Sequence, residues 1–105
     1  MKRRRVVLSP AARADLKWIY DTIAPAAGRA TALRYIERIE DYCRGFDYAS
    51  ERGSRRDELR RGLRTVGFER RVTIAFTVAT DEVVIFRVFY GGVNWEEEFA
   101  GDNEG

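Results

Sequence analysis

The chain has 105 residues, of which 45% are hydrophobic and 34% charged, and its formal net charge is +2. This length suits one domain, so the sequence predicts a single domain over residues 1–105 with an acidic tail from about residue 96 that could be flexible. A single cysteine excludes an internal disulfide, and the absence of histidine excludes Ser-His-Asp and Cys-His catalytic sets and imidazole metal sites. We therefore expect no metal and no cofactor. No apolar run reaches membrane-spanning length, so a cytoplasmic location is the default expectation.

The first half of the chain predicts one short strand and two helices. Residues 4–8 (RRVVL) form a β-branched run, after which Ser9 and Pro10 supply an N-cap and a first helical position. Apolar residues then recur every three or four positions until Pro25 and Gly28, which we expect to break the helix.

Residues 29–46 repeat the same apolar spacing and predict a second helix, so the two helices form a hairpin. Cys43 continues the apolar stripe of this second helix. We expect it to be a core residue and not a nucleophile.

The second half of the chain predicts three strands after a loop of about fifteen residues, a length that suggests a function for the loop. The apolar period becomes two from Leu63, which predicts strands over residues 63–68, 71–79 and 82–90. The order β-α-α-β-β-β predicts an α+β fold in which the helical hairpin packs on one face of a small, mainly antiparallel sheet.

Two helices cannot cover both faces of this sheet, so we expect the opposite face to be partly open. An unpaired guanidinium under the helices would be costly, and Arg87 is therefore assigned to the open face as part of a ligand site. A salt bridge within the domain, with Glu69 or Glu82, is the alternative. Strict alternation along the last strand places two sets of residues on opposite faces: Val83, Ile85, Arg87 and Phe89 on the open face, and Val84, Phe86, Val88 and Tyr90 under the helices.

The charges are segregated along the chain. Residues 51–71 carry eight arginines against four acids, whereas residues 96–105 carry five acids and no base. Such a basic block attracts phosphate or acidic protein, or it forms a solvated face with internal ion pairs.

Three arginines of this block, Arg60, Arg61 and Arg64, flank the start of the second strand. Their guanidinium forks could grip carboxylates of a partner protein. Local pairing with Asp57 and Glu58 is the alternative.

Three motifs in order carry a resemblance to a known family. They are S-P-A-A-x-x-D-L at the first helix, G-x-x-R-x-E-L-R-x-G-L-R at Gly53 to Arg64, and R-V-F-Y-G-G at Arg87 to Gly92. Over nearly its whole length the chain resembles the ParE branch of the ParE/RelE superfamily, the toxins of bacterial toxin-antitoxin pairs. The resemblance implies the element order just predicted and an antitoxin whose C-terminal segment lies across the toxin's helices and sheet.

The two branches of this superfamily differ in activity. ParE-type members are described as inhibitors of DNA gyrase that stall it on DNA and block replication, whereas RelE-type members cleave messenger RNA on the ribosome. RelE-like ribonucleases are described as cleaving RNA with basic side chains, often lysine, and a tyrosine or histidine near the C-terminus. Here the only lysines are Lys2 and Lys17, and arginine holds its proton too tightly to be an easy base.

A nuclease would therefore depend on Arg64, Arg87 and Tyr90. The sequence favours a non-enzymatic gyrase inhibitor that is neutralised by a ParD-like ribbon-helix-helix antitoxin and contacts DNA only through the antitoxin complex. The ribosome-dependent ribonuclease is the alternative. A plain nucleic-acid-binding module is a third hypothesis, and it is disfavoured because the aromatic residues do not interleave with the basic block.

The resemblance and the residue types together predict two sets of contact residues. We expect antitoxin contacts from Trp18, Tyr20, Arg60, Arg64, Arg87 and Phe89. We expect target contacts from Arg61, Tyr90, Trp95 and Phe99. For Trp95 and Phe99, folding back as a cap on the sheet edge or open face is the alternative.

Overall fold

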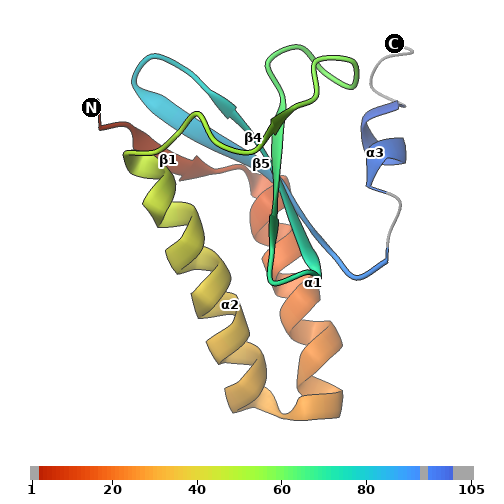
Figure 1. The fold of residues 1–105 in the computed structure, drawn as a ribbon. Coiled ribbons are helices and arrows are strands. Elements are labelled where there is room, and N and C mark those ends of the chain that lie inside the picture. Colours follow the sequence, from red (N-terminus) through yellow and green to blue (C-terminus); the bar gives the residue numbers. More distant parts are fainter. Residues whose placement is uncertain (1–2, 93–94, 101–105) are drawn as a thin grey trace.

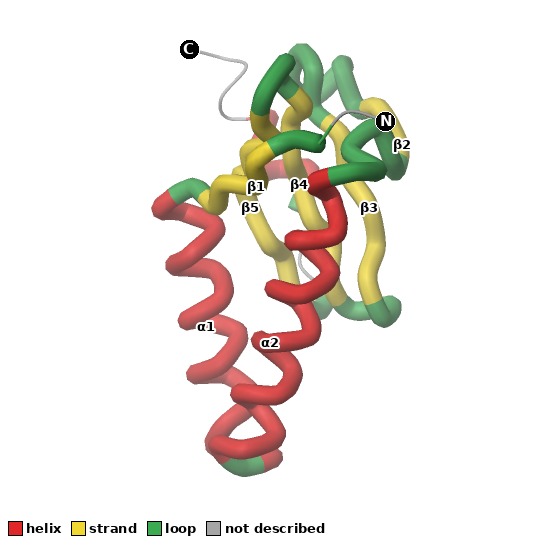
Figure 2. The backbone as a smooth tube through the Cα atoms, turned by 90° about the vertical axis from the view of Figure 1, so that its left-hand side faces the viewer, coloured by secondary structure: helices red, strands yellow, loops and turns green. Residues whose placement is uncertain are grey.

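The structure is a computed structural model that describes residues 3–92 and 95–100. Two long helices form one layer and a twisted sheet forms the other, and the tip of the helical hairpin extends beyond the sheet (Figures 1 and 2). The elements confirm the predicted α+β order and add a short strand and a C-terminal helix. In chain order they are β1 (Arg5–Leu8), α1 (Pro10–Ala27), α2 (Arg29–Arg44), the 3-10 turn η1 (Gly45–Asp47), β2 (Ser54–Arg55), β3 (Arg64–Phe68), β4 (Val72–Val78), β5 (Glu82–Tyr90) and α3 (Glu96–Ala100). None of the described helices is long and apolar enough to cross a membrane.

Helix α1 begins as the sequence predicts. Ser9 is the N-cap, its Oγ accepts a hydrogen bond from the Ala12 amide at 3.0 Å, and Pro10 occupies the first turn. The expectation that Pro25 breaks the helix is wrong, because α1 continues through it to Ala27. Only the last turn lies beyond Pro25, so the proline removes a single helical hydrogen bond, and Gly28 with a φ of 96° ends the helix.

The sheet has five strands in the order β1-β5-β4-β3-β2. Only β1 and β5 are parallel; the other neighbours are antiparallel, which confirms the mainly antiparallel sheet. β1 pairs with β5 only from Glu82 to Ile85, so the second half of β5 has no strand on that side.

The main core lies between the helical hairpin and the sheet. Buried residues of α1 and α2 at the predicted apolar positions pack against alternate residues of β4 and β5. Cys43 belongs to this core, as predicted: it is 1% exposed, and burial raises its thiol pKa to about 12.

A β-bulge in β5 corrects the predicted assignment of faces. Ala75 pairs with Arg87 but the next residue, Phe76, pairs with Ile85, so Phe86 is an extra residue that reverses the alternation. Beyond the bulge the prediction holds, since Val88 and Tyr90 face the helices. Before it the prediction is wrong, because Val83 and Ile85 also belong to the helix-side core, whereas Phe86 packs on the other face.

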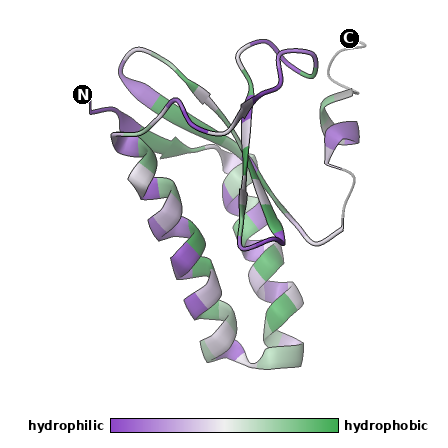
Figure 3. Cartoon of the chain, in the orientation of Figure 1, coloured by the Kyte–Doolittle hydropathy of each residue, from purple (hydrophilic) through white to green (hydrophobic). Residues whose placement is uncertain are grey.

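The sheet face opposite the helices is covered, which corrects the expectation of a partly open face. A second, smaller core lies there, and α3 packs on it (Figure 1). Figure 3 shows the loop that leads into β3 largely in hydrophilic colour. The second core consists of Leu63, Ala75, Phe89 and Phe99, with Leu59, Phe86 and Trp95 partly buried against it.

Candidate protein-binding surfaces

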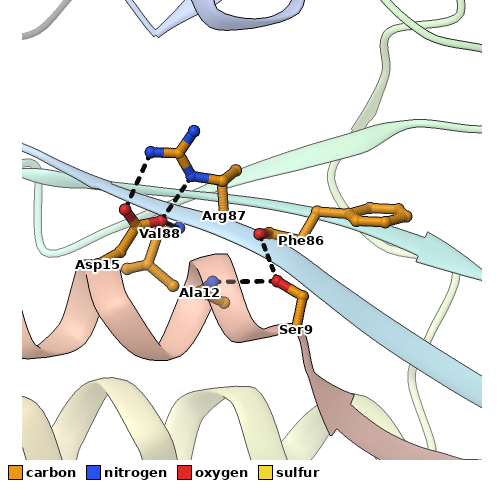
Figure 4. A network of polar contacts seen from close by, with 6 residues as sticks. All are labelled: Ser9, Ala12, Asp15, Phe86, Arg87 and Val88. Atoms are coloured by element: carbon orange, nitrogen blue, oxygen red, sulfur yellow. Dashed lines mark hydrogen bonds and ion pairs between the residues drawn. The ribbon is translucent and has the colours of Figure 1, made fainter.

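The unpaired half of β5 is covered by the start of α1 instead of by a strand (Figure 4). The Ser9 amide donates to the Ile85 carbonyl at 2.9 Å, and its Oγ donates to the Phe86 carbonyl at 2.7 Å. One turn further along α1, the Asp15 carboxylate accepts a hydrogen bond from the Val88 amide at 2.8 Å. Side chains of α1 thus satisfy backbone groups that a neighbouring strand would otherwise pair.

Arg87 forms a two-pronged ion pair with the same carboxylate. Its Nε and Nη2 donate to the two Asp15 oxygens at 2.8 and 3.0 Å, and its guanidinium lies 4.8 Å from the centre of the Phe89 ring. The Asp15 side chain is 15% exposed and that of Arg87 is 30% exposed. The expected Arg87 ligand site on an open face is therefore corrected to an ion pair within the domain, with Asp15 and with neither Glu69 nor Glu82 as its partner.

This ion pair joins two of the motifs that carry the family resemblance. Asp15 is the aspartate of S-P-A-A-x-x-D-L, and Arg87 is the arginine of R-V-F-Y-G-G. The two residues are 72 positions apart in the chain. Sequence reasoning missed Asp15 as a site residue, although its place in the first motif was a signal.

A cleft of about 380 Å³ opens beside the pair, between α1 and the end of β5. Trp18 and Tyr90 line it, with their ring centres 6.5 Å apart in an edge-to-face arrangement. Trp18 is 54% exposed, which makes it the most exposed large hydrophobic side chain of the described residues. The structure thus brings together Trp18, Arg87 and Tyr90, which the sequence assigned to two different partners.

A second groove, of about 570 Å³, runs between α1 and α2 on their outer side. Tyr20 lines it and is half-buried. Leu33, 52% exposed, lies in the same groove, and Arg13, Lys17 and Glu40 place charges around it. An apolar floor with charged sides is the usual character of a protein-binding groove.

Much of the arginine block holds the second half of the domain together. Arg52 donates to the carbonyls of Gly45 and Ala49 and lies over the Phe46 ring at 4.5 Å. Arg56 pairs with Glu58 at 2.6 Å and with Glu96 of α3 at 3.2 Å. The roles of Arg52 and of the Arg56–Glu96 pair were missed because their partners are backbone carbonyls and an acid 40 positions away, which no local spacing reveals.

The three arginines expected to bind partners lie in different surroundings. Arg60 is exposed, and its guanidinium stacks 4.6 Å from the centre of the Phe86 ring. Arg64 is half-buried and donates to the Arg52 carbonyl at 3.3 Å. Arg61 is exposed. The ion pairs with Asp57 and Glu58 are made instead by Arg55 and Arg56.

The C-terminal aromatics fold back as a cap on the sheet. Phe99 is 3% exposed and packs edge-to-face on Phe89 at 6.0 Å, while Trp95 stacks on Phe89 at 6.1 Å. Arg56 lies over the Trp95 ring at 5.1 Å. Phe89, 6% exposed, is covered by this cap, so a partner could reach it only if α3 moved.

The residues required by a nuclease lie in separate rows of the sheet. Arg64 pairs with Phe76, whereas Tyr90 pairs with Val72, which lies opposite Phe68. These two rows are four residues apart along β3, or roughly 13 Å at the usual strand rise. Arg87 lies between the rows and is bound to Asp15.

Comparison with known proteins gives a family match and similarity to solved structures. Residues 6–95 match the family described as the ParE toxin of the type II toxin-antitoxin system, parDE. A solved structure described as the chromosomal ParDE TA system from P. aeruginosa is 26% identical, with a TM-score of 0.74, and the match covers 85% of this chain and 97% of that chain. A search of curated proteins found no match.

Proposed function

The chain belongs to the ParE toxin family of type II toxin-antitoxin systems, and from this premise we propose that it is neutralised by a ParD-like ribbon-helix-helix antitoxin and inhibits DNA gyrase when released. The family match over residues 6–95 is the observation that carries this proposal. The mechanism is non-enzymatic: the toxin binds its target through surface contacts and blocks DNA replication.

The antitoxin segment binds on the helical side of the toxin. The groove between α1 and α2, with Tyr20 in its wall, receives an amphipathic segment. The exposed Trp18 ring, which lines the cleft between α1 and β5, is the aromatic anchor for the same partner. Arg87 lines the neighbouring cleft with Trp18, and its partly exposed side chain contacts an acidic side chain of the antitoxin there. Arg60 and Arg64 remain candidate contacts for a segment that continues around the domain, and Phe89 would join them only if α3 moved.

A matched pair of variants tests this surface. Trp18→Ala is expected to weaken antitoxin binding by at least about tenfold, as for a central aromatic anchor. Tyr48→Ala removes another aromatic ring of similar exposure, 49%, at the far end of the domain, and is expected to change affinity by less than about twofold. Titration calorimetry with purified antitoxin measures both. Equal affinities for the two variants would contradict the proposed surface.

Target contacts lie on the side of the sheet that carries α3. Arg61 and Trp95 are accessible there and contact gyrase, while Phe99 is the buried anchor that holds α3 in place. Tyr90 lies on the helical side beside Trp18, so bound antitoxin covers it. Arg61→Glu and Trp95→Ala are expected to relieve inhibition of gyrase supercoiling while leaving antitoxin affinity unchanged. Full inhibition by both variants would exclude this target surface.

The separation of Arg64 from Tyr90 supports the inhibitor over the ribosome-dependent ribonuclease, the alternative activity of the superfamily. Of the residues available for that chemistry, Arg87 is paired with Asp15, and the described lining of its cleft contains no lysine. Cleavage therefore lacks a group to take up the 2′-hydroxyl proton.

A further inference from the structure

A cleft at the end of β5 gathers arginines that none of the surfaces above uses. It has a volume of about 540 Å³ and lies between α2, the turn joining β3 to β4, and Tyr90. Figure 3 shows this turn in hydrophilic colour at the lower end of the strands. We call it the arginine cleft; its polar lining consists of Arg34, Tyr35, Arg38, Glu69, Arg70 and Arg71.

The charge of the arginine cleft exceeds that of the whole protein. Its four arginines and one glutamate sum to +3, against a net charge of +2 for the chain. Arg38 is paired with the acid of the cleft, since its Nε and Nη2 donate to the two Glu69 oxygens at 3.0 and 3.3 Å. Within residues 3–92 and 95–100, the other three guanidinium groups, those of Arg34, Arg70 and Arg71, have no acidic partner.

The turn holds two of these arginines in a defined place. Glu69 and Arg70 have φ values of 48° and 66°, in the left-handed region that few residues other than glycine adopt. The Arg71 amide donates to the Glu69 carbonyl at 2.8 Å, and the Arg71 carbonyl accepts from the Gly91 amide at 2.9 Å. The tight turn is thus tied to the end of β5 and places its arginines opposite α2.

The donor set fits phosphate better than carboxylate. A carboxylate is planar, and one guanidinium fork spans both of its oxygens, as the Arg38 fork does for Glu69. A phosphate has acceptor oxygens in several directions and can meet forks from α2 and from the turn together. Burial and the nearby Tyr90 raise the pKa of Tyr35, so its hydroxyl stays protonated as a further donor.

We propose that the arginine cleft binds the phosphate groups of a nucleic-acid strand. Trp18 lies beside Tyr90, which lines the cleft, and its exposed ring offers a stacking surface for a base next to those phosphates. Aromatic and basic side chains therefore interleave here through the fold, although they do not in the arginine block of the sequence. The toxin contacts nucleic acid directly, in contrast to the expectation that it does so only through the antitoxin complex. This contact does not depend on gyrase being the target.

Fluorescence polarisation with the purified full-length toxin and a labelled oligothymidylate of about 12 nucleotides tests the proposal. Three phosphate contacts predict that the logarithm of the affinity falls with the logarithm of salt concentration with a slope of about −2. Arg34→Glu and Arg71→Glu each weaken binding by at least about tenfold and make the slope shallower by roughly 0.7. Both side chains are exposed and on different elements, so neither change disturbs the core.

Arg55→Glu is the control, because it changes the net charge equally from an exposed position on β2, the far edge strand. It is expected to change affinity by less than about twofold. Equal loss in all three variants would show attraction by net charge alone and would overturn the site. Two competitors identify the ligand. Displacement of the oligonucleotide by poly-glutamate at equal charge would assign the cleft to acidic protein. If the toxin binds inorganic phosphate but fails to bind the oligonucleotide, the cleft is a site for free phosphate. Either result overturns the proposal.

Discussion

Replacing Asp15 with alanine is expected to lower the free energy of unfolding by about 2 kcal/mol. The change removes an acceptor of three hydrogen bonds, two from Arg87 and one from the Val88 amide. Breaking a fully buried ion pair costs about 3–5 kcal/mol. The cost is smaller here, because Arg87 is 30% exposed and water can hydrate it once Asp15 is gone.

Thermal and urea unfolding measure this loss. At 4–8 °C per kcal/mol for a domain of this size, the midpoint should fall by roughly 10 °C. Asp21→Ala is the matched control: it removes an aspartate from the same helix, where the 2.7 Å ion pair with Lys17 is exposed, and should leave stability near that of the wild type.

A double-mutant cycle with Arg87→Ala isolates the pair itself. A coupling energy of about 1–2 kcal/mol between Asp15 and Arg87 is expected, since they share two charged hydrogen bonds. If Asp15→Ala is as stable as Asp21→Ala, or if the coupling energy is near zero, this pair does not hold α1 against the unpaired half of β5.

Three further changes follow from the packing. Gly53→Ala should destabilise the domain by about 2 kcal/mol or more, because its Cβ would lie 2.3 Å from the Thr65 carbonyl oxygen at a φ of 74°. Gly62→Ala is the control: its φ is 79° but no atom lies within 4 Å of the added Cβ, so it should cost only about 1 kcal/mol. Phe99→Ala should cost about 2–3 kcal/mol and speed amide hydrogen exchange along β5, which unchanged exchange would contradict. Cys43 should resist alkylation by iodoacetamide at pH 8 until the protein unfolds, and rapid alkylation of the native protein would place it outside the core. Its contribution to stability should fall as pH rises from about 9 toward the folded thiol pKa of about 12, because in that range the thiol ionises only in the unfolded chain.

The sequence predicted the elements better than the contacts between them. The cap at Ser9 and the apolar spacing of both helices are local signals, and the structure confirms them. The faces of Val83, Ile85 and Phe86 could not be derived, because one extra residue at Phe86 reverses the alternation and no local signal marks the bulge.

The candidate site was harder to predict because its members are distant in the chain. Arg87 binds Asp15, which is 72 positions away in the chain. Arg71 and Arg34 line one cleft only because the β3–β4 turn lies opposite α2. Counting charges by segment drew attention to residues 51–71 as one block, in which Arg52 and Arg56 hold the domain together while Arg70 and Arg71 line the arginine cleft. The interleaving of aromatic and basic residues appears only once the fold is formed.

One paired measurement tests the central claim most directly. Purified toxin is added to DNA gyrase with relaxed plasmid and, separately, to ribosomes carrying messenger RNA, each with and without antitoxin. The account predicts that supercoiling stops, that cleaved gyrase-DNA complexes accumulate, that antitoxin reverses both effects, and that the messenger RNA stays intact. Codon-specific cuts in the messenger RNA with gyrase unaffected would contradict it.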